Sequence, residues 1–123
     1  EKAGKKIKRH ITSDKGGTMR LGAYSCDIIK NSLAFKIYGK KRIRERHRHR
    51  YEVNSEYEKV YGENSLVFSG KSPDGKLPEI IEIKNHPWFF GVQFHPELKS
   101  RPFNPHPVFK SFVAATIKYT KKL

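Results

Sequence analysis

The sequence predicts an α/β fold, and three features carry this prediction. The run at 88–94 is aromatic and β-branched with few charges, which is typical of a buried central strand. Two other runs, 18–24 and 44–53, alternate with the period of two that a strand requires. The C-terminal run 108–119 instead repeats apolar residues at helical spacing. We therefore expect a sheet with an amphipathic helix docked at the end of the chain.

The composition is that of one globular unit. A chain of 123 residues can bury a core, and 36% hydrophobic with 12% aromatic residues argues against disorder. No apolar run approaches the ~20 residues that a membrane helix needs, so no membrane partner is expected. The single cysteine, Cys26, excludes an internal disulfide and favours the cytoplasm.

The charge is strongly basic and unevenly distributed. Against 12 acidic residues stand 26 Lys and Arg, a net charge of +14. Residues 1–50 hold 16 basic and 4 acidic side chains, whereas residues 51–123 hold 10 and 8. Such asymmetry indicates a polyanionic partner, whether nucleic acid, nucleotide or another anionic substrate, and does not select among them.

The first half of the chain predicts few elements. Residues 1–15 are Lys-rich with few apolar residues, so we expect an exposed connector. A glycine pair opens the strand at 18–24, and residues 31–38 carry mixed signals that fit a short helix or a loop. Cys26 lies between them without the glycine-rich elbow of a nucleophile, and is expected to be a packed thiol.

The second half is more regular. Asn54 is a good N-cap residue and Glu follows in the first turns, which predicts a short helix at 54–61. The runs 65–69 and 77–83 flank a Pro-Asp-Gly turn and should form a hairpin. Residues 85–87 turn the chain into the run 88–94, and the proline-rich segment 101–107 is expected to be a loop covering the end of that strand.

The run 88–94 leads into a histidine and a carboxylate two residues apart. Pro96 has no N–H for a ladder, so the strand should end there. Positions i and i+2 of an extended chain point to the same side, so His95 and Glu97 should lie together. A carboxylate so placed can orient the imidazole as the base of a nucleophilic site. A histidine and a glutamate at a surface strand end is the commonplace alternative.

Residues 44–53 form a second candidate site. Their alternation places Arg46, Arg48 and Arg50 on one face and His47 and His49 on the other. This arginine face suits a solvated edge strand, a phosphate-binding ribbon, or a guanidinium that clamps a carboxylate through two hydrogen bonds. No metal site is expected, because the two histidines supply only two ligands and the chain offers little sulfur.

Six blocks of the sequence resemble the CTP synthase family, in the same order. They are 17–22, 45–54, 72–75, 86–89, 93–97 and 100–102. In that family the blocks lie in the C-terminal class I glutamine amidotransferase domain, and the match runs from about residue 16 to residue 119. The last two blocks are shared across class I amidotransferases, whereas the Thr-Met-Arg and Arg/His blocks point to CTP synthases.

The resemblance implies both a fold and an activity. Residues 1–123 would be the C-terminal half of a flavodoxin-like class I amidotransferase domain, with a mostly parallel sheet and flanking helices. The family phosphorylates UTP with ATP on a synthetase domain and aminates it to CTP, using ammonia from glutamine hydrolysed on this domain. ATP and Mg would bind the synthetase domain, which lies outside this chain, GTP would be an activator, and this chain would hold no cofactor. The parent would be a cytoplasmic homotetramer.

The resemblance also implies roles for individual residues. His95 matches the proton-shuttling histidine of a Cys-His-Glu triad, and Glu97 matches the glutamate that orients it. Arg50 matches the arginine that holds the glutamine α-carboxylate.

Other roles are less specific or lie outside these blocks. Arg20, Arg46 or Arg48 could serve the GTP activator. The nucleophile of the family sits in a glycine-rich elbow upstream of the matched blocks, and Cys26 lies in the wrong place for it. The chain alone, without that thiol and its oxyanion hole, is therefore expected to be inactive.

Two other interpretations stay open at this stage. A basic nucleic-acid-binding module would explain the charge but not the run 94–97, and the chain lacks the interleaved stacking aromatics of a single-strand binder. The amidotransferase domain of another synthetase, serving GMP or carbamoyl phosphate synthesis, would explain 93–97 but not the Arg/His block.

Overall fold

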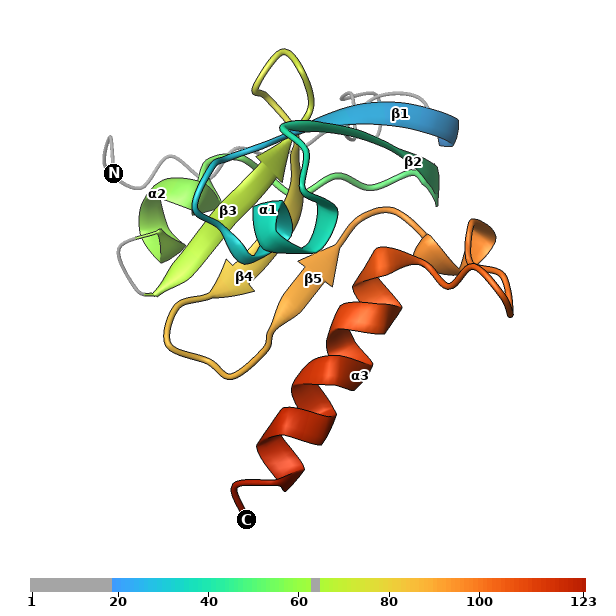
Figure 1. Cartoon of the computed structure of the whole chain (residues 1–123). Helices are drawn as coiled ribbons and strands as arrows, with labels where there is room; N and C mark the ends of the chain where they lie inside the picture. Colours follow the sequence, from blue (N-terminus) through green and yellow to red (C-terminus); the bar gives the residue numbers. More distant parts are fainter. Residues whose placement is uncertain (1–18, 63–64) are drawn as a thin grey trace.

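The computed structural model describes residues 19–62 and 65–123. In chain order the elements are β1 (Arg20–Ile28), α1 (Leu33–Tyr38), β2 (Arg42–His49), α2 (Tyr57–Tyr61), β3 (Leu66–Lys71), β4 (Pro78–Ile83), β5 (Phe90–Val92), the 3₁₀ helix η1 (Pro96–Leu98) and α3 (Pro107–Thr120). The strands form one sheet in the order β2-β1-β3-β4-β5, with α1 against it and α3 beside β5 (Figure 1). The α/β prediction is confirmed, while the connector expected at 1–15 lies outside the described residues.

The sheet is antiparallel in the described part of the chain. Each of its four pairings, from β2 with β1 to β4 with β5, runs antiparallel. The prediction of a mostly parallel sheet is therefore wrong for these strands. The links 72–77 and 84–89 are short turns, whereas parallel neighbours need a crossover of about a dozen residues or more.

The β1–β2 ribbon presents two unlike faces. Its register pairs Arg20 with His49 at one end and Asp27 with Arg42 at the other. Along β2, exposed arginines alternate with buried side chains, as the sequence predicts. No described strand pairs with β2 on its outer side, and its charges suit such an edge. The strand ends at His49, so Arg50 lies just beyond it in a bend.

β5 differs from the predicted buried central strand. It spans three half-buried residues and lies at the other edge of the described sheet. The aromatic residues before it pack elsewhere: the Trp88 ring lies 5.1 Å from the Phe112 ring, and its Nε1–H donates to Ser111 Oγ at 2.9 Å. The aromatic run therefore indicates side chains that pack against other elements. Trp88 packs against α3 and does not belong to a strand of the sheet.

The core lies between the sheet and α1. Its buried members are Cys26, Ile28, Ala34, Ile43, Ile80 and Phe94. Gly70 allows β3 to approach this core closely, because a Cβ there would lie 2.6 Å from the Ile80 side chain and 2.9 Å from the Cys26 sulfur. The prediction that Cys26 is a packed thiol is confirmed, since it is fully buried.

The mixed signals at 31–38 resolve into α1 because its first turn is capped twice. The Ser32 hydroxyl accepts a hydrogen bond from the Phe35 amide, and the Glu82 carboxylate of β4 accepts from two further amides of this turn. Gly39, with φ 65°, ends the helix in the left-handed conformation that favours glycine.

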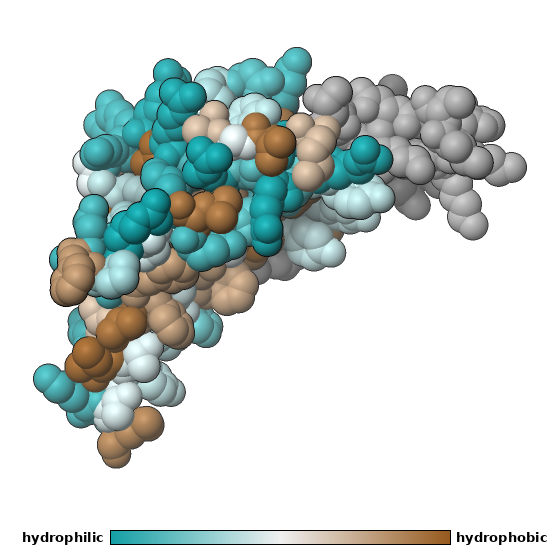
Figure 2. All heavy atoms as spheres, turned by 90° about the vertical axis from the view of Figure 1, so that its right-hand side faces the viewer, coloured by the Kyte–Doolittle hydropathy of each residue, from teal (hydrophilic) through white to brown (hydrophobic). Residues whose placement is uncertain are grey.

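α3 docks less than its amphipathic sequence predicts. Its one buried residue is Val108, whereas Phe109, Phe112, Val113 and Ile117 are 38–55% exposed. Figure 2 shows apolar side chains along the lower part of the molecule that α3 forms. The prediction of a docked helix holds for its first turns and is wrong for the rest. Among the described helices, none combines the length and apolar character needed to cross a membrane.

Candidate functional site

His95 and Glu97 form a dyad at the end of the segment that follows β5. His95 Nδ1 lies 2.7 Å from Glu97 Oε1, which confirms that the two side chains point to the same side. Pro96 begins η1 between them and is buried, so it fixes the turn from which both side chains project. The strand itself ends earlier than predicted, at Val92. The His95 and Glu97 side chains are 29% and 53% exposed, and can therefore be reached by a substrate.

The electrostatics assign the protons of this dyad. The pKa of the Glu97 carboxyl lies below its usual value because its own backbone amide donates to it, and because His95 and the positive charge of Arg48 stabilise the anion. An ionised carboxylate only accepts hydrogen bonds, so Nδ1 of His95 carries the hydrogen between them. Nε2 of a neutral His95 then has its lone pair directed away from Glu97. It can take a proton from a nucleophile.

The dyad lies beside the arginine face of β2. The His95 backbone N–H donates to the Arg46 carbonyl at 2.9 Å, and the Lys99 ammonium donates to the Arg44 carbonyl at 2.7 Å. These two bonds join η1 to the edge of β2. Arg46, Arg48 and Arg50 are exposed. The structure thus brings the two sequence-predicted sites, His95 with Glu97 and the arginine run, into one region.

Arg20 is set apart from the other arginines. It is 8% exposed, its guanidinium donates to Glu79 Oε1 at 2.8 Å, and it lies 4.4 Å from the centre of the Tyr24 ring. A guanidinium committed to a buried carboxylate presents little surface to a nucleotide. Of the arginines suggested for GTP, Arg46 and Arg48 therefore remain accessible on the surface, and Arg20 has a structural partner.

The opposite face of β2 carries buried charges that sequence reasoning missed. His47 Nδ1 lies 2.8 Å from His49 Nε2, and His47 Nε2 lies 3.4 Å from Glu79 Oε2. Glu79 and His47 are each 1% exposed. The strand period placed the two histidines together, but Glu79 belongs to β4. Only the folded sheet shows that they meet.

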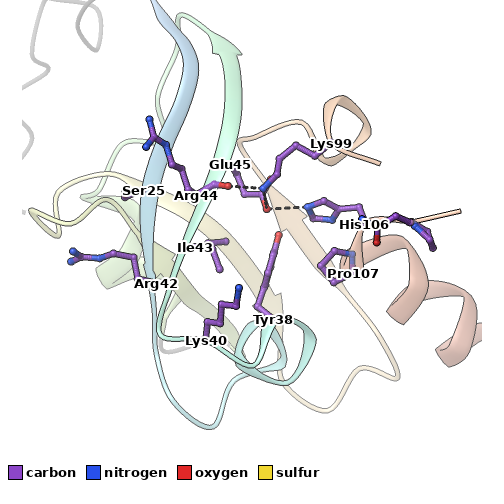
Figure 3. Close-up of a pocket in the computed structure, with 12 residues that line it drawn as sticks. Ser25, Tyr38, Lys40, Arg42, Ile43, Arg44, Glu45, Lys99, His106 and Pro107 are labelled. Carbon is purple, nitrogen blue, oxygen red and sulfur yellow. Dashed lines mark hydrogen bonds and ion pairs between the residues drawn. The ribbon is translucent and has the colours of Figure 1, made fainter. Parts of the chain in front are cut away.

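A second buried cluster joins β2 to the start of α3 (Figure 3). His106 Nε2 lies 2.9 Å from Glu45 Oε1, and the Lys99 ammonium lies 3.2 Å from the same oxygen. Burial alone would raise the pKa of Glu45, but the hydrogen bond from His106 and the charge of Lys99 hold it below its usual value. Burial and the nearby Glu45 in turn raise the pKa of Tyr38.

An open pocket of about 630 Å³ lies over this second cluster and contains neither His95 nor Glu97. His106 in its lining is fully paired: Nδ1 accepts from the Val108 amide while Nε2–H donates to Glu45 Oε1. This pairing fixes the entry into α3. The second Glu45 oxygen and the Tyr38 hydroxyl are buried and have no hydrogen-bond partner among the described residues. The pocket and the His95–Glu97 dyad are therefore separate features of this part of the molecule.

Cys26 is unsuited to nucleophilic attack. Burial raises the pKa of its thiol far above the ordinary value, and the adjacent Glu79 carboxylate raises it further. A thiolate is the reactive form of cysteine, so this sulfur stays protonated and inert. Within residues 19–62 and 65–123, no three His, Cys, Asp or Glu side chains are grouped so as to hold a metal ion.

Known sequences match this chain over most of its length. The family model described as glutamine amidotransferase class-I matches residues 1–115. The CTP synthase of Hyphomonas neptunium is 55% identical over 120 residues, and that of Clostridium kluyveri is 62% identical over 109 residues. These alignments cover 98% and 89% of this chain but 22% and 20% of the relatives. The chain therefore spans about a fifth of their length.

Two solved structures also match most of this chain. The glutaminase domain of Trypanosoma brucei CTPS, solved with bound acivicin, matches with a TM-score of 0.78 and 38% identity. That match covers 86% of this chain and 42% of the trypanosomal one. A GMP synthase component from Thermoplasma acidophilum matches over 87% of this chain and 49% of its own, with a TM-score of 0.62 at 17% identity. This second match shows likeness of fold alone.

Proposed function

Because this chain belongs to the class-I glutamine amidotransferase family, we propose that it is part of a CTP synthase and that glutamine is hydrolysed on its domain. The ammonia released would aminate UTP that ATP has phosphorylated on a synthetase domain outside this chain. The observation that carries the proposal is the dyad: His95 Nδ1 lies 2.7 Å from Glu97 Oε1 at an accessible position.

The dyad has the geometry of a proton shuttle. Glu97 would fix the imidazole so that Nε2 of His95 can face the reacting groups. Nε2 would take the proton of an attacking thiol and return it to the amide nitrogen, so that ammonia leaves and a thioester forms. Water activated by the same Nε2 would then release glutamate and regenerate the thiol.

The nucleophile of this reaction would come from outside the present chain. Cys26 is fully buried and its raised pKa keeps it protonated, so it offers no thiolate to the dyad. The oxyanion hole would likewise be supplied by residues beyond this sequence. We therefore propose that the domain's catalytic centre is completed by a second segment, and that this chain by itself releases no glutamate from glutamine.

Arg50 would hold the substrate. It is exposed in the bend after β2, the strand to which His95 is joined through the Arg46 carbonyl. A guanidinium can bind a carboxylate through two parallel hydrogen bonds, which fixes both position and orientation. Arg50 would thus bind the α-carboxylate of glutamine and bring its side-chain amide toward His95.

The remaining components belong to the whole enzyme. We propose that ATP and Mg bind the synthetase domain, that GTP activates the enzyme with Arg46 or Arg48 as contacts, and that the parent is a cytoplasmic tetramer. The basic residues of β2 support an anionic ligand of this kind, because their side chains are exposed on one face.

The test is the identity of the ammonia acceptor. A full-length protein that contains this chain is supplied with glutamine, ATP and Mg, and either UTP or the acceptor of another amidotransferase, xanthosine monophosphate. Formation of CTP is expected. Amination of the purine nucleotide instead would assign the chain to a different synthetase, and salt-dependent binding to random DNA without glutamine hydrolysis would assign it to nucleic acid.

A further inference from the structure

The buried face of β2 carries a closed ring of polar contacts beneath the segment that presents Arg50. Going round the ring, the members are Arg20, Glu79, His47, His49 and Glu52. Arg20 lies 2.8 Å from Glu79 and 3.7 Å from Glu52, and His49 Nδ1 lies 3.8 Å from Glu52. His49 Nδ1 also lies 3.0 Å from the backbone carbonyl of Tyr51, the residue after Arg50.

Three successive gaps in this ring each need one hydrogen. The first lies between the Tyr51 carbonyl and His49 Nδ1, the second between His49 Nε2 and His47 Nδ1, and the third between His47 Nε2 and Glu79 Oε2. The two ends of this series, a carbonyl and a carboxylate, are acceptors only. Two neutral imidazoles carry two hydrogens between them, so one gap is left without a hydrogen.

The geometry shows which gap it is. The first two gaps measure 3.0 and 2.8 Å, which are hydrogen-bond distances, whereas the third measures 3.4 Å. Both atoms of the third gap, His47 Nε2 and Glu79 Oε2, are buried and lack a hydrogen-bond partner. With both histidines neutral, a lone pair faces a carboxylate oxygen, which is repulsive in a buried site.

The charge balance favours one further proton. With neutral histidines the ring holds one positive charge, on Arg20, against two negative charges, on Glu52 and Glu79. An added proton makes the ring neutral and completes the third hydrogen bond, whichever of its members carries the proton. The described groups that also face this pair are the Cys26 thiol, which adjoins Glu79, and the rings of Tyr24 and Phe94, whose centres lie 5.5 and 5.9 Å from that of His47.

We propose that His47 and Glu79 share this buried proton, and that it makes His47 a positioning residue for the glutamine clamp. The proton completes a series of hydrogen bonds that ends on the Tyr51 carbonyl and so holds the bend that carries Arg50. Loss of the proton to solvent hydroxide leaves a net negative charge in the ring and repulsion across the third gap. The Arg50 bend is then less firmly held, and glutamine binds more weakly.

This proposal rests on the proposed function and is tested in the full-length enzyme. The KM for glutamine in CTP formation is measured between about pH 7 and pH 9.5, a range that lies above the ordinary imidazole pKa of about 6.5. Across this pH range, the KM of the wild type is expected to rise by a factor about ten times larger than the KM of Glu79→Gln. A factor of about ten corresponds to the loss of one buried hydrogen bond. In Glu79→Gln the amide oxygen still accepts from Arg20, and the amide N–H reaches His47 Nε2 without any added proton.

A second variant guards against misfolding of the first. His47→Asn keeps a donor at the position of Nδ1 but has no atom to bridge to Glu79. Its KM for glutamine should be raised at every pH, with kcat and ammonia-dependent CTP formation unchanged. The matched control for Glu79→Gln is Glu82→Gln. Glu82 is a second buried carboxylate of β4, and it accepts hydrogen bonds from α1 instead of from the ring. Glu82→Gln should keep the wild-type dependence of KM on pH.

The outcomes separate the two claims. A parallel rise of KM with pH in wild type and Glu79→Gln, or an unchanged KM in folded His47→Asn, would overturn the shared proton. Failure of the wild type to use glutamine at any pH would instead overturn the proposed function. In a third outcome, the wild type uses glutamine and Arg50→Ala weakens glutamine binding, but Glu79→Gln and His47→Asn have no effect on it. That result would support the proposed function and would overturn only the shared proton.

Discussion

The backbone N–H of His95 donates a hydrogen bond to the carbonyl of Arg46 at 2.9 Å. This bond joins the segment after β5 to the edge of β2, and so places the His95–Glu97 dyad beside the arginine face. A mutation in either segment can therefore affect glutamine use, although the two are far apart in the sequence. Separate substitutions test the roles of Arg50, of Cys26, of the Glu45–His106 pair and of the His95–Glu97 dyad.

Arg50→Ala should weaken glutamine binding in the full-length enzyme. Loss of a charge-assisted pair with the α-carboxylate should cost roughly 2–4 kcal/mol of binding free energy. This cost should be seen mainly as a higher KM for glutamine, with a smaller effect on kcat. Arg50→Lys should restore only part of this, because an ammonium cannot form the two parallel bonds. Steady-state kinetics with glutamine give the answer. An unchanged KM together with lost GTP activation would place Arg50 in the nucleotide site.

Cys26→Ala should leave the glutamine-dependent reaction in place. The thiol is fully buried and its raised pKa keeps it protonated, so its loss removes packing rather than chemistry. The expected cost is about 1–2 kcal/mol of unfolding free energy, typical of removing a small buried group. Both quantities are measured on the full-length protein, by glutamate release and by denaturant unfolding. Abolished glutamate release from a folded variant would show that Cys26 is the nucleophile.

The Glu45–His106 pair should stabilise the fold in a pH-dependent manner. The folded pKa of Glu45 is lowered, so its stabilising effect is present above the usual carboxyl value of 4.5 and is lost as the pH falls through the lower, folded value. Glu45→Gln should therefore reduce the unfolding free energy at neutral pH by about 1–3 kcal/mol, and by less in acid.

Thermal unfolding between neutral and acid pH measures this difference. Glu56→Gln, which changes an exposed carboxylate at the start of α2, is the control and should follow the wild type. A Glu45→Gln deficit that is equal at all pH values would mean that the charge of Glu45 does not contribute to stability.

Local rules predict much of the site. The contact between His95 and Glu97 is predicted correctly, but the rule for an extended chain is not its cause, because β5 ends at Val92 and Pro96–Leu98 is a 3₁₀ helix. The period of two does apply along β2, where it separates the arginine face from His47 and His49. Both features depend on backbone geometry within a few residues. They do not depend on how the strands are arranged.

The failures concern partners that are distant in the sequence. Glu79 meets His47 only because β4 and β2 fold onto the same core, and no local pattern marks that pair. The resemblance implies a mostly parallel sheet, whereas the described strands pair antiparallel. Trp88 suggested a central strand, although its aromatic ring packs against Phe112 of α3.

The most direct test of the account is to replace His95 in the full-length enzyme and to supply either glutamine or ammonia. His95→Ala removes the proton shuttle alone, so CTP formation from glutamine should fall by at least about a hundredfold, while formation from ammonia continues at the wild-type rate. Glu97→Ala should show the same pattern with a smaller loss, because the imidazole loses its orientation and not its base. Equal loss of both activities in folded His95→Ala would contradict the assignment of the dyad to glutamine hydrolysis.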